Sequence, residues 1–225
     1  MSLTFDSPAD TGLLKALALS TICKGGMARE FGSGSARNLR ACSRLGYEAV
    51  GYDVNPDVVE QALLCIDREA LAAKVLCEDV LTLTLAPKSI SVAIVGTTVY
   101  WPKSVVNTFL ASLWRAINVN GILHIEFTTP RDGAYESEFC VYTCFPYPEA
   151  GYTNSFAHYC GYPCNLNHPG VIGASFWESD EVTATLSKLG KWELIHRSLD
   201  EWQQTFEDDA PMLRSFERVT VQKTS

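Results

Sequence analysis

Residues 27–39, MAREFGSGSARNL, predict a strand, a glycine turn and the start of a helix. Gly32 and Gly34 have no Cβ and can take positive φ, so the backbone can turn sharply and approach a ligand closely. The helix after the turn offers free backbone N–H groups at its N-terminus. A second strand is predicted at 48–53, and Asp53 at its end is placed to accept hydrogen bonds from two ribose hydroxyls. The stretch therefore indicates a nucleotide site at the edge of a parallel sheet.

The spacing of the glycines argues against two common nucleotide motifs. The dinucleotide fingerprint G-x-G-x-x-G would need a glycine where this chain has Arg37. A Walker loop, G-x-x-x-x-G-K-[ST], does not occur in the sequence. What remains is E-x-G-x-G-x-A, in which Glu30 precedes the first glycine by two residues. The charge of Glu30 would repel a pyrophosphate and attract an ammonium or sulfonium group.

This pattern resembles the first motif of class I S-adenosylmethionine-dependent methyltransferases. Ala36 stands where the family usually has a third glycine, which is a mild departure. The resemblance assigns Glu30 and the turn to the methionine part of the cofactor, Asp53 to the ribose, and Asp79 with Val80 to the adenine. The cofactor-binding residues that it implies are Glu30, Gly32, Ser33, Gly34, Asp53, Val54, Asp79, Val80 and Gly96.

The order of the predicted elements is similar to that of the same family. It implies an α/β fold with a doubly wound, mostly parallel, seven-stranded Rossmann-like sheet and an irregular insertion after the fifth strand. Hydrophobic spacing predicts helices from Ser7 to Ser20, after the glycine turn to Gly46, and at 57–73, 104–117 and 179–190. Further strands are expected at 75–77, 90–95, 122–127, 191–196 and 218–222, with a helix or loop carrying Trp202, Phe206 and Met212 before the last one. The leading helix either covers the cofactor, as is frequent in the family, or packs on the sheet edge.

A long irregular segment interrupts the single domain expected over residues 1–225. From 128 to 175 helical periodicity stops, and Pro, Gly, Tyr and Phe are frequent. So long an irregular segment in a compact domain is usually functional, so we interpret it as an insertion that covers the substrate. Its cysteines, Cys140, Cys144, Cys160 and Cys164, form two C-x-x-x-C pairs that allow a zinc site. Because small zinc sites mostly use C-x-x-C, we expect buried free thiols and no metal.

Candidates for a general base are few. Tyr100 follows the apolar strand at 90–95, whose end is where open α/β sheets bind ligands. His158 lies in the insertion, and Glu126 lies near the end of the next strand. His124 is flanked by apolar residues, so we expect a core histidine there. The [N/D]-P-P-[Y/F] string of DNA amino-methyltransferases does not occur after residue 95.

Composition limits the class of partner. The formal net charge is −8, which argues against nucleic acid because tight binding to its backbone needs a basic surface. No apolar run approaches the ~20 residues of a membrane helix, and the N-terminus lacks a basic-then-apolar signal. We therefore expect a cytoplasmic protein with reduced thiols, no membrane partner and a small-molecule substrate. The sequence does not predict an oligomeric state.

The resemblance implies an S-adenosylmethionine-dependent methyltransferase that acts on a small organic acceptor by in-line displacement and releases S-adenosylhomocysteine. Two alternatives remain open. A nicotinamide-dependent oxidoreductase is compatible with Asp53, although Arg37 argues against it. The other is a non-catalytic binding module in which zinc staples the segment 140–164.

Overall fold

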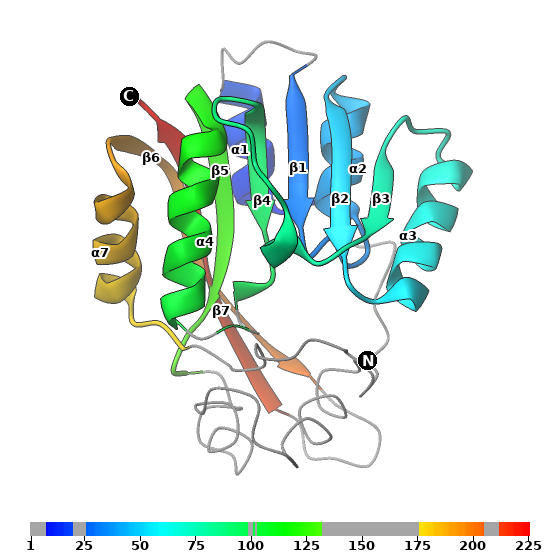
Figure 1. The fold of residues 1–225 in the computed structure, drawn as a ribbon. Coiled ribbons are helices and arrows are strands. Elements are labelled where there is room, and N and C mark those ends of the chain that lie inside the picture. Colours follow the sequence, from blue (N-terminus) through cyan, green and yellow to red (C-terminus); the bar gives the residue numbers. More distant parts are fainter. Residues whose placement is uncertain (1–7, 20–25, 99–100, 102, 132–175, 205–211) are drawn as a thin grey trace.

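The computed structural model describes residues 8–19, 26–98, 101, 103–131, 176–204 and 212–225. Seven strands form one sheet in the order β3-β2-β1-β4-β5-β7-β6, and β7 runs antiparallel to both of its neighbours (Figure 1). The elements are α1 (Thr11–Leu19), β1 (Met27–Phe31), α2 (Arg37–Arg44), β2 (Glu48–Asp53), α3 (Pro56–Arg68), β3 (Lys74–Cys77), η1 (Val80–Thr82), β4 (Ile90–Val95), α4 (Lys103–Ala116), β5 (Ile117–Thr128), α7 (Ser179–Leu189), β6 (Trp192–Gln204) and β7 (Met212–Lys223). The predicted mostly parallel, seven-stranded sheet is confirmed.

Helices cover both faces of the sheet. Buried side chains of α1 and α2 pack on one face with those of β1, β4 and β5, and α3 extends this layer over β2 and β3. Helices α4 and α7 cover the other face, where the largest hydrophobic cluster lies (Figure 1). The six residues of β4, ISVAIV, are all buried, as expected of a central parallel strand with apolar side chains on both faces.

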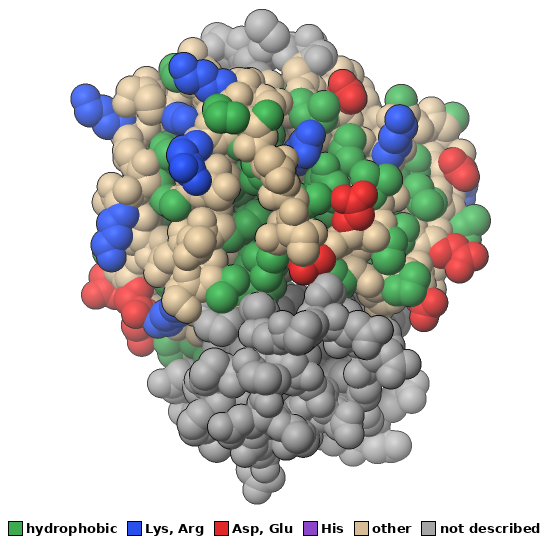
Figure 2. All heavy atoms as spheres, viewed as in Figure 1, with side chains coloured by type: hydrophobic (Ala, Val, Ile, Leu, Met, Phe, Trp, Pro, Cys, Tyr) green, Lys and Arg blue, Asp and Glu red, His purple; other side chains and the backbone are tan. Residues whose placement is uncertain are grey.

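The connection between β3 and β4 contains one 3-10 turn, η1, in place of a helix. This connection packs three partly buried leucines against the main hydrophobic cluster: Leu81, Leu83 and Leu85. They cover part of the sheet where a helix would otherwise lie. Figure 2 shows hydrophobic side chains at the surface of this face over β3 and α3, and Leu76 on β3 is 38% exposed.

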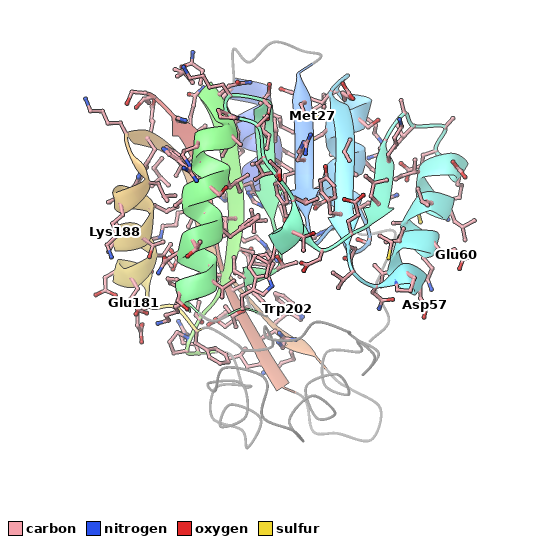
Figure 3. The ribbon with its side chains drawn as sticks, in the orientation of Figure 1. Met27, Asp57, Glu60, Glu181, Lys188 and Trp202 are labelled. Carbon is pink, nitrogen blue, oxygen red and sulfur yellow. The ribbon has the colours of Figure 1, made fainter. Side chains whose placement is uncertain are left out.

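All parallel strands end at one edge of the sheet. In Figure 3, Met27 begins β1 at the upper edge, whereas Asp57, just after β2, lies at the lower edge. Trp202, near the end of β6, lies on the same lower side. In an open α/β sheet this carboxyl edge is where ligands bind.

Several predicted boundaries were wrong. Helix α3 ends at Arg68 instead of position 73, because the chain turns at Ala70, whose φ is +50°. The predicted helix or loop before the last strand is absent from the described residues around Trp202 and Met212, which lie inside β6 and β7. These two strands pair over twelve registered positions and form a ribbon that extends past the end of β5. Phe206 lies outside the described residues.

Helix α1 packs on the sheet through Leu13, Ala16 and Leu17, which are buried. Its buried side chains pack with those of β1, β4 and β5, and it also contacts β6 and β7, so the described helix packs on the sheet. A role of this helix in covering the cofactor stays a prediction. It begins at Thr11, later than predicted, and Ser7 lies outside the described residues. Among the described residues, no helix has the length and hydropathy that a membrane crossing requires.

Candidate cofactor site

The glycine turn leaves β1 at Phe31 and is fixed to the neighbouring strand. The N–H groups of Gly32 and Ser33 both donate to the Tyr52 carbonyl, at 2.9 and 2.8 Å. Gly32 has φ +74° and Gly34 has φ +49°, so both use the left-handed region that favours glycine. A Cβ on Gly32 would lie 1.6 Å from Cγ2 of Thr97, whereas a Cβ on Gly34 would meet nothing within 4 Å. The turn is therefore packed tightly on one side and open on the other.

Ala36 also takes the left-handed conformation. It is the N-cap of α2, with φ +54° and ψ +23°, and it is fully buried. A non-glycine residue in this region costs roughly 1–2 kcal/mol. This conformation explains why a glycine would suit position 36. The chain adopts the same left-handed conformation with an alanine there.

Asp53 lies directly beside the glycine turn. Its carboxylate is 4% exposed and accepts hydrogen bonds from the Gly34 N–H at 2.9 Å and the Asn55 N–H at 3.0 Å. Burial raises the pKa of Asp53, and hydrogen bonds from the backbone N–H groups of Asn55, Gly34 and Val54 oppose that rise. A carboxylate can accept about four hydrogen bonds, so Asp53 keeps capacity for a further donor such as a hydroxyl. The predicted proximity of Asp53 to the turn is confirmed, and its contact with ribose stays a prediction.

Glu30 supports the turn from inside the protein. Its carboxyl group is 4% exposed, and Oε2 accepts a hydrogen bond from the Leu39 N–H of α2 at 3.1 Å. Burial raises its pKa to about 8, with the Leu39 N–H and the charge of Arg37 opposing the rise. The group therefore holds a proton at neutral pH, which differs from the anionic partner expected for an ammonium. Its assignment to the methionine part stays a prediction.

The remaining predicted cofactor residues lie at the ends of adjacent strands. Asp79 caps η1, and its Oδ1 accepts a hydrogen bond from the Leu81 N–H at 3.0 Å. Val80 is buried in the main hydrophobic cluster, and Val54 follows Asp53 directly. The Glu78 N–H donates to the Asp53 carbonyl at 3.0 Å, which joins the end of β3 to the end of β2.

Gly96 completes this edge on the other side of β1. Its N–H donates to the Phe31 carbonyl at 3.2 Å, and a Cβ there would lie 3.5 Å from the Gly32 carbonyl oxygen. The ends of β1, β2, β3 and β4 are thus linked by backbone contacts around the predicted positions.

Thr97 was not among the predicted cofactor residues. Its methyl group packs where a Cβ of Gly32 would lie, and its buried Oγ1 has no hydrogen-bond partner among the described residues. A buried hydroxyl without a partner costs free energy, so a ligand donor or acceptor there would be favourable. Its only sequence signal was its place directly after Gly96. The open side of Gly34, the spare capacity of Asp53 and this hydroxyl together fit a nucleoside cofactor.

Of the three predicted candidates for a general base, the described residues include only Glu126. Tyr100 and His158 lie outside the described residues. Glu126 on β5 forms an ion pair with Arg218 of β7, with 2.6 Å between Oε2 and Nη2. His124 is 2% exposed, and its ring nitrogens contact the Thr220 hydroxyl at 2.8 Å and the Asp10 carboxylate at 3.2 Å. The prediction of a core histidine is confirmed, and Glu126 is occupied by a cation instead of being free to take a proton.

The cysteines of the zinc hypothesis, Cys140, Cys144, Cys160 and Cys164, all lie outside the described residues. Within the parts that the structure describes, no group of three or more His, Cys, Asp or Glu side chains could hold a metal ion.

Comparison with known proteins finds a family model that matches part of this chain. Residues 29–125 match the family model described as a methyltransferase domain, which includes the glycine turn, Asp53 and the end of β4. No curated protein sequence matches the chain.

Several solved structures share the fold. An S-adenosylmethionine-dependent methyltransferase from Methanosarcina mazei is 13% identical, with a TM-score of 0.59, and the match covers 89% of this chain and 93% of that one. Magnesium protoporphyrin IX methyltransferase from Synechocystis PCC 6803, solved with bound cofactor, is 12% identical, with a TM-score of 0.56 and coverage of 92% and 75%. A protein solved in work on the conversion of a disulfide into a thioacetal in echinomycin biosynthesis is 15% identical, with a TM-score of 0.61 and coverage of 98% and 84%. At these identities the likeness shows the fold.

Proposed function

Because residues 29–125 match a methyltransferase-domain model, we propose that the chain is a class I, S-adenosylmethionine-dependent methyltransferase that methylates a small organic acceptor at the carboxyl edge of its sheet. The observation that supports this most is the hydrogen bond from the Gly34 N–H to Asp53, which joins the two halves of the cofactor motif. The fold and the family match favour this function over the nicotinamide-dependent alternative.

We assign the chain's residues to parts of the cofactor as follows. Asp53 accepts the ribose hydroxyls through its unused lone pairs, and the open side of Gly34 admits the cofactor to the turn. Asp79 and Val80 border the adenine, and Gly96 with Thr97 borders the sulfur end. Glu30 holds the first turn of α2 through the Leu39 N–H.

Methyl transfer requires mainly that the protein align the methyl donor with the acceptor. Bound S-adenosylmethionine supplies a methyl group on a sulfonium, which is already activated for displacement. The protein therefore acts by holding donor and acceptor in line and excluding water. Tyr100 and His158 are the remaining candidates for a base if the acceptor must lose a proton.

The net charge and the insertion both favour a small acceptor. A net charge of −8 disfavours a nucleic acid. We propose one domain over residues 1–225 in which 128–175 covers a small acceptor. We also place the protein in the cytoplasm, where its thiols stay reduced, in keeping with the free thiols of Cys42, Cys65 and Cys77.

A labelled-methyl assay tests the acceptor class. The protein is incubated with cofactor carrying a radioactive methyl group and with three separate fractions of cell extract: small molecules, proteins and nucleic acids. We expect label to enter the small-molecule fraction. Label found only in protein or nucleic acid would overturn the small acceptor while leaving methyl transfer intact.

A further inference from the structure

A buried aspartate connects the N-terminal helix to the cofactor motif. Asp10 precedes α1 and is 9% exposed. Its backbone N–H donates to Asn38 Oδ1 at 2.8 Å, and Asn38 Nδ2 donates back to Asp10 Oδ2 at 3.0 Å. Arg37 Nη2 lies 2.8 Å from Asp10 Oδ1. Asp10 therefore holds the first two residues of α2, which directly follow the glycine turn.

The same carboxylate is held from the sheet. His124 Nε2 lies 3.2 Å from Asp10 Oδ2, and Arg218 Nε lies 3.6 Å from Asp10 Oδ1. Burial alone would raise the pKa of Asp10, but the His124 hydrogen bond and the two arginines hold it well below its usual range. The aspartate is thus anionic at neutral pH and fixed against β5 and β7, which are parts of the rigid sheet.

Helix α2 depends on such external support. It has only eight residues, and isolated helices of this length are not stable in water. Its N-cap, Ala36, has a strained φ and offers no side chain to the free N–H groups, and the first turn contains no acidic residue. Asp10 supplies an anionic partner for the side chains of Arg37 and Asn38 in this first turn.

The glycine turn is therefore fixed at both ends. At its start, Gly32 and Ser33 are bonded to Tyr52 of β2, and at its end, Arg37 and Asn38 are bonded to Asp10. Gly34, whose N–H meets Asp53, lies between the two anchors. Releasing the second anchor would let the turn move relative to Asp53.

From this geometry we propose that Asp10 is a positioning residue for cofactor binding, which acts through Arg37 and Asn38 on the glycine turn. The proposal rests on the cofactor site assigned above. It gives the segment before α1 a role in donor binding that the family-matched residues 29–125 do not include.

The test compares two substitutions in the same buried network. Asp10→Asn removes the charge that holds α2, whereas Thr220→Val removes the other hydrogen-bond partner of His124 and touches no residue of α2. The affinity for S-adenosylhomocysteine is measured by calorimetry, at a temperature where circular dichroism shows each variant folded. We expect roughly tenfold weaker binding for Asp10→Asn, equivalent to ~1.4 kcal/mol, and binding within about twofold of wild type for Thr220→Val.

A second measurement needs no ligand. Amide hydrogen exchange at Gly34 and Leu39 should be faster in Asp10→Asn than in wild type and unchanged in Thr220→Val. Arg37→Gln, at a partly exposed position, serves if Asp10→Asn does not fold, and it should weaken binding in the same direction.

The outcomes separate the two proposals. Unchanged affinity and exchange in Asp10→Asn, or in Arg37→Gln where that variant replaces it, would overturn the role of Asp10. Equal weakening by Asp10→Asn and Thr220→Val would also overturn it, since that indicates general destabilisation. Failure of the wild-type protein to bind S-adenosylhomocysteine would instead contradict the assigned cofactor site.

Discussion

At the scale of single residues, the proposed site depends on the Asp53 carboxylate, whose hydrogen-bonding capacity is only partly filled by backbone N–H groups. Asp53→Ala removes two acceptors for ribose hydroxyls, so we expect S-adenosylhomocysteine binding to weaken by about 1–3 kcal/mol. Calorimetry measures the change. Asp57→Ala, a nearby exposed acid in the first turn of α3, is the matched control and should bind as wild type does. Unchanged affinity in Asp53→Ala would remove Asp53 from the site.

Alanine substitutions at the two turn glycines should have different effects on stability and on cofactor binding. Gly32→Ala adds a methyl group onto Thr97 in a left-handed backbone, so we expect a loss of about 2–5 kcal/mol in the free energy of unfolding. Gly34→Ala carries the strain without the clash, so it should lose only about 1–2 kcal/mol. Its new methyl group would point into the space assigned to the cofactor, so binding should be lost in a folded protein. Urea unfolding and calorimetry together test this, and normal binding by Gly34→Ala would contradict the placement of the cofactor.

Glu30 makes stability depend on pH. Its pKa is raised to about 8 in the folded protein from 4.5, so the folded state keeps a proton that the unfolded state releases between these values. Its contribution is fully present below pH 4.5 and is lost as pH rises toward 8, at ~1.4 kcal/mol per pH unit at most. Glu30→Gln keeps an acceptor for the Leu39 N–H but cannot ionise.

The comparison of the two proteins by urea unfolding isolates this group. We expect Glu30→Gln and wild type to be similar at pH 4.5 and the variant to be more stable by a few kcal/mol at pH 8. An equal difference at both pH values would mean that Glu30 is not buried in its neutral form.

At the scale of elements, sequence patterns predicted most helices and strands but not where they stop. Helix α3 shows why: apolar residues continue with helical spacing to Leu71, yet the helix ends at Arg68 because Ala70 turns to φ +50°. Alanine normally favours a helix, so the local sequence does not predict that the helix ends here. The same holds for β6 and β7, whose outer halves are strand because they pair with each other, a non-local cause.

The end of α3 can be tested by one substitution. Ala70 is exposed, so Ala70→Gly removes left-handed strain without removing buried surface. We expect the free energy of unfolding to rise by about 0.5–1 kcal/mol. Ala72→Gly, also exposed and without positive φ, is the control and should not stabilise. Stabilisation by both variants, or by neither, would contradict this account of the helix end.

The candidate site was predictable where residue type and spacing carry the chemistry. The position of Asp53 beside the glycine turn was predicted correctly, because a sharp turn needs glycine and the ends of adjacent parallel strands meet at one edge. Thr97, Asp10 and the ion pair of Glu126 were not, because their roles come from contacts between elements distant in sequence. The neutral form of Glu30 was missed for the same reason, since burial is set by packing.

At the scale of the whole molecule, the strand order places the ends of β1, β2, β3 and β4 side by side at one edge. Every described residue assigned to the cofactor lies at or near these ends, so one topology explains the whole set. The β6–β7 ribbon reaches the same side of the protein, where Trp202 lies (Figure 3). The central claim is that this edge binds a sulfonium nucleoside.

Calorimetric titration of the wild-type protein with S-adenosylhomocysteine, and separately with NADH, tests that claim most directly. We expect saturable binding of one S-adenosylhomocysteine per chain and no heat with NADH. Heat with NADH and none with S-adenosylhomocysteine would contradict it.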